Sequence, residues 1–160
     1  MKFALVLLSL AACTSLISGT ATVARADDSE IPTVDCTGSA PTGFFRAAIR
    51  LKSDGLNENG FGGFNLYEGS VLAGYVGAKA VLNDGVLEIR DQATRAGLAP
   101  SQLVLDIYMN RPVAGGQSKN AVLLRASKSF FYQASDELLS AINASPTGIN
   151  LSCRVSGFGD

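Results

Sequence analysis

Residues 71–90 have the sequence VLAGYVGAKAVLNDGVLEIR, which contains the clearest β-hairpin pattern of the chain. Two largely apolar arms, residues 71–82 and 86–90, flank the Asn-Asp-Gly of residues 83–85. An Asp-Gly pair tolerates the positive φ angles that tight hairpin turns require. The segment therefore predicts two antiparallel strands that are joined by a short turn.

Apolar and polar residues alternate with a period of two on both sides of this hairpin. In residues 45–52 every second residue from Phe45 to Leu51 is apolar, and similar alternation occupies residues 103–110 and 149–155. This period is typical of a strand that packs one face against a core. Further predicted strands are residues 61–68, 121–126 and 129–133.

One helix is predicted near the C-terminus. Ser135 is a favourable N-cap, acidic residues follow it in the first turn, an apolar stripe occupies residues 138–142, and Pro146 ends the helix. Residues 27–33 are polar and are expected to form a loose lead-in. About eight short strands and one short helix predict an all-β fold, either an antiparallel β-sandwich or a partly open barrel.

The first 26 residues have the features of an export signal. Lys2 supplies a minimal positive region, residues 3–10 form an apolar core, and residues 24–26 give the A-x-A pattern that signal peptidase recognises. Cleavage after Ala26 would leave residues 27–160 as a single β-rich domain. We therefore expect the protein to be secreted or periplasmic.

Cys13 leaves a second interpretation open. The sequence LAAC at residues 10–13 resembles the lipobox of bacterial lipoproteins, in which the cysteine carries lipid and anchors the protein to a membrane. An uncleaved apolar anchor is a third interpretation, because no charged residue lies between Phe3 and Ala24. Contact with a membrane is expected only if the chain is anchored, above all through a lipid on Cys13.

The other two cysteines predict a disulfide. Once Cys13 is removed, Cys36 and Cys153 form an even pair in an oxidising compartment, although two buried free thiols are the alternative. The alternation in residues 149–155 places Cys153 on the apolar face of its strand. A disulfide between them would hold the two ends of the domain side by side and make the first and last strands neighbours.

The composition argues against several kinds of function. The chain has 160 residues and no histidine, so the commonest general base and metal ligand is missing. Its formal net charge is −1, which gives no electrostatic reason to bind a nucleic acid. No cofactor-binding or metal-binding motif is present, and we expect no cofactor, no metal site and no nucleic-acid partner.

The glycine-rich residues 60–64 (GFGGF) mark the predicted contact surface. Phe61, Phe64 and Tyr67 would present aromatic rings to a protein, a glycan or an envelope surface. The alternative is that these rings fold back into the core, as aromatic residues that flank a turn usually do. The best prediction from these features is an exported, non-enzymatic binding or structural module.

Two other functions remain open. A small secreted hydrolase would need two carboxylates that face one another across a cleft. The candidates for such a pair are Glu58, Glu68, Glu88 and Asp106. A secreted inhibitor or effector would instead present residues 60–64 to another protein as a protruding loop.

Three basic residues lie on one face of the predicted strand at residues 45–52, namely Arg46, Arg50 and Lys52. This face is either a weak anion-binding stripe or a solvated surface that is paired with neighbouring acidic residues.

Overall fold

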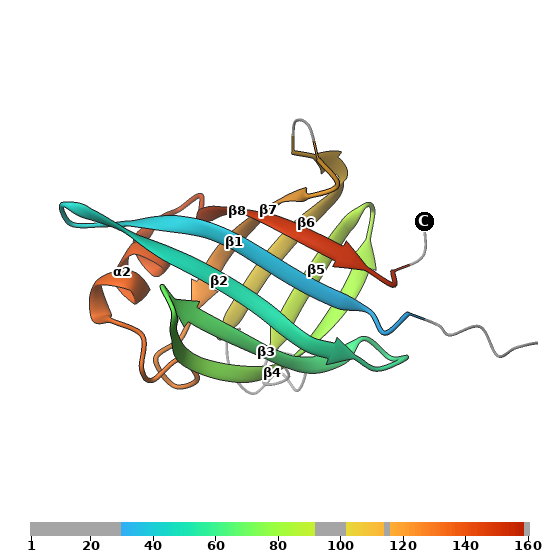
Figure 1. Ribbon diagram of the computed structural model, residues 1–160, viewed down its shortest axis with the longest axis horizontal. Helices are drawn as coiled ribbons and strands as arrows, with labels where there is room; N and C mark the ends of the chain where they lie inside the picture. The colour runs from blue at the N-terminus through green and yellow to red at the C-terminus, as the bar shows by residue number, and fades with distance from the viewer. Residues whose placement is uncertain (1–29, 92–101, 114–115, 159–160) are drawn as a thin grey trace, which may run out of the picture.

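Eight antiparallel strands form a closed barrel in which each strand pairs with the next strand of the chain, and the last pairs with the first (Figure 1). The structure is a computed structural model, and it describes residues 30–91, 102–113 and 116–158. The predicted signal peptide, including Cys13, lies outside these residues. The strands are β1 (Thr33–Thr42), β2 (Phe45–Leu56), β3 (Phe61–Glu68), β4 (Val71–Asn83), β5 (Val86–Asp91), β6 (Leu103–Pro112), β7 (Lys119–Ala126) and β8 (Ile149–Ser156).

The β4–β5 hairpin has the geometry that its sequence predicts. The strands pair as far as Asn83 and Val86, and the two residues between them have positive φ angles of 48° at Asp84 and 77° at Gly85. Positive φ at both turn positions matches the right-handed twist of the flanking strands. This hairpin and its neighbours confirm the all-β fold with about eight strands, and the sheet closes completely.

The interior of the barrel is a packed apolar core. The alternation along each strand points every second side chain inward, and an eight-stranded barrel is just wide enough for such side chains to fill it. The largest fully buried side chains are Leu51, Phe64, Leu66, Leu87, Ile89, Leu103, Leu105, Ile107, Leu123, Phe131, Leu138 and Ile142.

Helix α2 (Asp136–Ala144) lies at one end of the barrel (Figure 1). The Ser135 hydroxyl caps its first turn by accepting a hydrogen bond of 3.1 Å from the Leu138 N–H, as the sequence predicts. Glu68, at the end of β3, accepts hydrogen bonds from the backbone N–H and the hydroxyl of Ser135. The apolar face of the helix, including Ile142, is buried against the core. In the described part of the chain, α2 and every other helical segment are too short or too polar to cross a bilayer.

Two expectations about the strands need correction. Strand β1 extends from Thr33 to Thr42, where the sequence showed only a lead-in and then no clear alternation, because Gly38 and Pro41 interrupt its pattern. The predicted strand at residues 129–133 is wrong. That segment is a series of turns in which the N–H groups of Phe130 and Phe131 donate to the Ser127 carbonyl.

A disulfide joins β1 to β8. Cys36 lies directly opposite Cys153 in the register of these two strands, and the predicted bond between them is present. Both residues are fully buried. The bond therefore fixes the strand pair that closes the barrel, and the expected proximity of the first and last strands is confirmed.

Replacing both cysteines by alanine is expected to lower the free energy of unfolding by about 4–5 kcal/mol, from the entropy of closing a loop with this separation of 117 residues. Urea denaturation of the oxidised protein and of the Cys36→Ala, Cys153→Ala variant measures the difference. The wild-type protein under reducing conditions is the control and should resemble the variant. A loss below about 1 kcal/mol would contradict this role for the disulfide.

Candidate functional site

The outer faces of β1 and β8 carry a row of open cavities, which we call the seam groove because it follows the strands that the disulfide joins. It consists of three adjoining cavities of about 560, 300 and 350 Å³. Thr37 and Ser152 line both the first and the second cavity, and Asp35 and Arg154 line both the second and the third. The packed interior leaves this external surface as the candidate binding site.

Most of the polar side chains that line the seam groove are hydroxyls and amides. These side chains belong to Thr33, Thr37, Ser39, Gln117, Ser118, Asn120, Ser145, Asn150, Ser152 and Ser156. Arg46, Arg50 and Arg154 add guanidinium groups, whereas Asp35 is the only acidic residue among the lining residues that the structure describes. Such a surface has many hydrogen-bond donors and an excess of positive charge.

A charged cluster lies in the middle of the groove. Arg50 binds Asp35 in a bidentate arrangement, with Nε 2.8 Å from Oδ1 and Nη2 2.5 Å from Oδ2. Strand pairing places Asp35 between Lys52 on β2 and Arg154 on β8. One carboxylate thus faces three cations, and the cluster keeps two positive charges in excess.

The electrostatics of Asp35 reflect this arrangement. The hydrogen bonds from Arg50 are the main cause that lowers the pKa of the Asp35 carboxyl, against a smaller opposing effect of burial. The positive charges of Arg50, Lys52 and Arg154 lower the pKa further. Asp35 therefore stays ionised and holds the Arg50 guanidinium in place, and the charges of Lys52 and Arg154 remain to attract an anion.

The predicted basic stripe on β2 becomes part of this groove. Arg46 lines the largest cavity and donates a hydrogen bond of 3.0 Å to the Ser39 hydroxyl. Arg50 lines the central cavity, and Lys52 lies opposite Asp35. One acidic residue, Asp35, pairs with the stripe through Arg50, and binding of an anion by the remaining charges stays a prediction.

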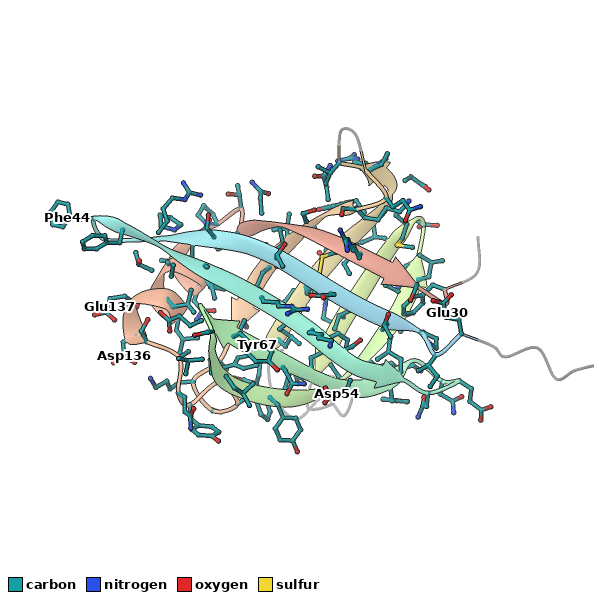
Figure 2. The ribbon with its side chains drawn as sticks, viewed as in Figure 1. Glu30, Phe44, Asp54, Tyr67, Asp136 and Glu137 are labelled. Atoms are coloured by element: carbon teal, nitrogen blue, oxygen red, sulfur yellow. A yellow bond between two sulfur atoms is a disulfide. The ribbon has the colours of Figure 1, made fainter. Side chains whose placement is uncertain are left out.

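The three predicted contact residues do not form one exposed surface. Phe64 is 0% exposed and packs inside the barrel, so its assignment to a contact surface is wrong. Phe61 is half-buried, and the Lys79 ammonium lies 4.8 Å from the centre of its ring. Tyr67 is half-buried on the outer face of β3, opposite Arg50 of β2 (Figure 2). Residues 61–64 form the first half of β3.

Only two of the four candidate carboxylates, Glu88 and Asp106, come together. Glu58 lies in the β2–β3 turn, and Glu68 is bound to Ser135 at the start of α2. Glu88 and Asp106 are direct neighbours on β5 and β6, but Arg90 forms an ion pair of 2.5 Å with Asp106. This arrangement is typical of a charged cluster on the convex face of a sheet. Among the described residues, no group of three or more acidic residues or cysteines is placed to hold a metal ion.

The sequence pattern did not single out Phe44, and its placement of Phe45 on the core-facing side of a strand is wrong. Phe44 and Phe45 occupy the tip of the β1–β2 hairpin and are 102% and 81% exposed (Figure 2). Gly43, with φ of 54°, forms part of the turn before them. Their exposure could have been predicted from the sequence, because the Phe-Phe pair directly follows Thr-Gly, at a position where a hairpin turn usually has polar residues.

No protein-family model matches the chain, and no curated protein or solved structure is significantly similar to it. Its function is therefore argued from the geometry alone.

Substitution of Phe64 by alanine should lower the free energy of unfolding by about 3–5 kcal/mol, because it opens a cavity in the packed interior. The matched variant Phe61→Ala removes a half-buried ring and should cost less than half as much. Urea denaturation measures both losses. Equal losses, or a larger loss for Phe61→Ala, would be inconsistent with the described burial of these rings.

Proposed function

We propose that this protein is an exported, non-enzymatic binding module whose seam groove binds an extended acidic glycan. The observation that carries the proposal is the charged cluster of Asp35, Arg50, Lys52 and Arg154 in the middle of a groove of hydroxyl and amide side chains. Guanidinium groups bind carboxylates through charge-assisted hydrogen bonds, which are stronger than neutral ones. The hydroxyls and amides beside them match the alternating donors and acceptors of sugar hydroxyls.

The shape of the groove favours a chain over a compact molecule. Its three cavities follow one another along β1 and β8, from Ser145 near the helix to Ser156 at the end of β8. An extended ligand can contact the whole length, with its acidic group at the central cluster. A small anion would use only the central cavity.

The closed barrel argues against an extended peptide as the ligand. Peptides commonly bind to a sheet by adding a strand to a free edge. The pairing of β1 with β8 covers the edge of β1 as far as Gly38, and the edge of β1 is free only along residues 39–42. A ligand that lies across the outer faces of the strands must instead be held by side chains, which suits a glycan.

The disulfide supports an oxidising compartment, because such bonds persist mainly in secreted and periplasmic proteins. The predicted signal in residues 1–26 supports the same location. Glycans with carboxylate groups are accessible to a protein that works outside the cytoplasm.

Isothermal titration calorimetry with a galacturonic acid hexamer tests this proposal. The Arg154→Gln substitution is expected to weaken binding at least tenfold, since a hydrogen bond to a charged group contributes about 1.5–3 kcal/mol. Arg154 is the better target than Arg50, whose loss would also leave Asp35 without its hydrogen-bond partner.

The matched control is Lys79→Gln, which removes a positive charge from β4, on the opposite side of the barrel. This variant should bind the hexamer as the wild-type protein does, and raised salt should weaken binding in both. Failure of the wild-type protein to bind the hexamer, or an equal loss in both variants, would refute the proposal.

A further inference from the structure

The β1–β2 hairpin continues beyond the neighbouring strands as an arm, whose inner side is packed on helix α2, with Ala40 fully buried. Pairing of β1 with β8 ends at Gly38, and pairing of β2 with β3 ends at Ile49, whereas β1 and β2 continue to pair with each other as far as Thr42 and Phe45. Residues 39–48 therefore lack a neighbouring strand on either side. Figure 1 shows the arm extending past the other strands, and Figure 2 places Phe44 at its outermost point.

Other apolar side chains are exposed at the same end of the barrel. Because the strands alternate in direction, the β3–β4 turn and the connection from β7 to α2 lie at the end that carries the arm. Val71 and Leu72 follow that turn, and Tyr132 belongs to that connection; all three are exposed. The Gln133 N–H donates a hydrogen bond of 2.9 Å to the Ala73 carbonyl, which holds this second apolar patch together.

We infer that Phe44 and Phe45 insert into a phospholipid bilayer, with the patch of Val71, Leu72 and Tyr132 resting on the same membrane surface. The two inserted rings lie at the tip of the arm, whereas Ser39, Pro41 and Arg46 of the arm also line the first cavity of the seam groove. Insertion of the two rings adds a route to the membrane other than a lipid on Cys13.

The shape of the two apolar surfaces favours a bilayer over a protein partner. The tip is convex and narrow, whereas a stable protein interface buries roughly 800 Å² on each side. The second patch belongs to other elements at the same end of the barrel, so one protein pocket would have to match both. A membrane is a planar apolar solvent, and it accepts several separate side chains at one end of a molecule without such a match.

The charge of the arm is compatible with lipid headgroups. Residues 39–48 contain one charged residue, Arg46, which directly follows Phe45. With both rings among the acyl chains, the Arg46 guanidinium would lie at the level of the phosphates, which it can bind. The arm itself contains no acidic residue, and the exposed carboxylates at this end of the barrel, Asp136 and Glu137, belong to the first turn of α2 (Figure 2).

The chain contains no tryptophan, so one introduced tryptophan reports on its own surroundings. The full-length Phe44→Trp protein is mixed with phosphatidylcholine–phosphatidylglycerol vesicles, with and without bromine on the acyl chains. Its emission should shift to shorter wavelengths and be quenched by the brominated lipid.

The matched control is Leu82→Trp, because Leu82 is exposed at the opposite end, at the close of β4. Its emission should be unaffected by brominated lipid. Adding Phe45→Ser to the Phe44→Trp protein should weaken vesicle binding by about tenfold or more, because it removes one of the two inserted rings.

Three outcomes would overturn the inference. The first is no quenching of the Phe44→Trp protein, and the second is equal quenching of the Leu82→Trp control. The third is a dimer of the wild-type protein in gel filtration that Phe45→Ser dissociates, which would assign the tip to a second copy of the chain instead of lipid.

Discussion

The pairing of β1 with β8, held by the Cys36–Cys153 disulfide, converts an eight-stranded sheet into a closed barrel. Without this pair the sheet would have two free edges, and exposed edges invite pairing with other chains. With it, all eight strands direct alternate side chains into one interior, which they fill. The two cysteines are 117 positions apart in the sequence, so this single disulfide encloses nearly all of the chain that forms the barrel.

Because the interior is filled, a ligand can bind only on the outer surface of the barrel. Strand β1 contributes to both of the proposed binding surfaces. Its first half supplies Asp35 and Thr37 to the seam groove, and its second half forms one side of the projecting arm. The groove requires β1 to lie between β2 and β8, because Arg50 comes from one neighbour and Arg154 from the other. The strand that closes the barrel therefore also assembles the charged cluster.

Local patterns predicted much of the fold, but little of the candidate site. The turn at Asp84 and the helix cap at Ser135 depend on nearby residues, so the sequence alone identified both. Strand β1 was missed because Gly38 and Pro41 interrupt its alternation, and pairing with two neighbours stabilises it instead. The charged cluster combines two consecutive strands, β1 and β2, with β8 from the other end of the barrel sequence. The burial of Phe64 could have been predicted from the sequence, because alternation along a strand places Phe64 on the same face as Leu66.

Amide hydrogen exchange of the oxidised and reduced protein tests most directly whether the disulfide-linked strand pair closes the barrel. In the oxidised protein, the amides that pair β1 with β8 should exchange as slowly as those that pair β4 with β5. Reduction should accelerate exchange along β1 and β8 first, while the β4–β5 amides keep their protection. Rapid exchange along β1 and β8 in the oxidised protein, or exchange that reduction leaves unchanged, would contradict the account.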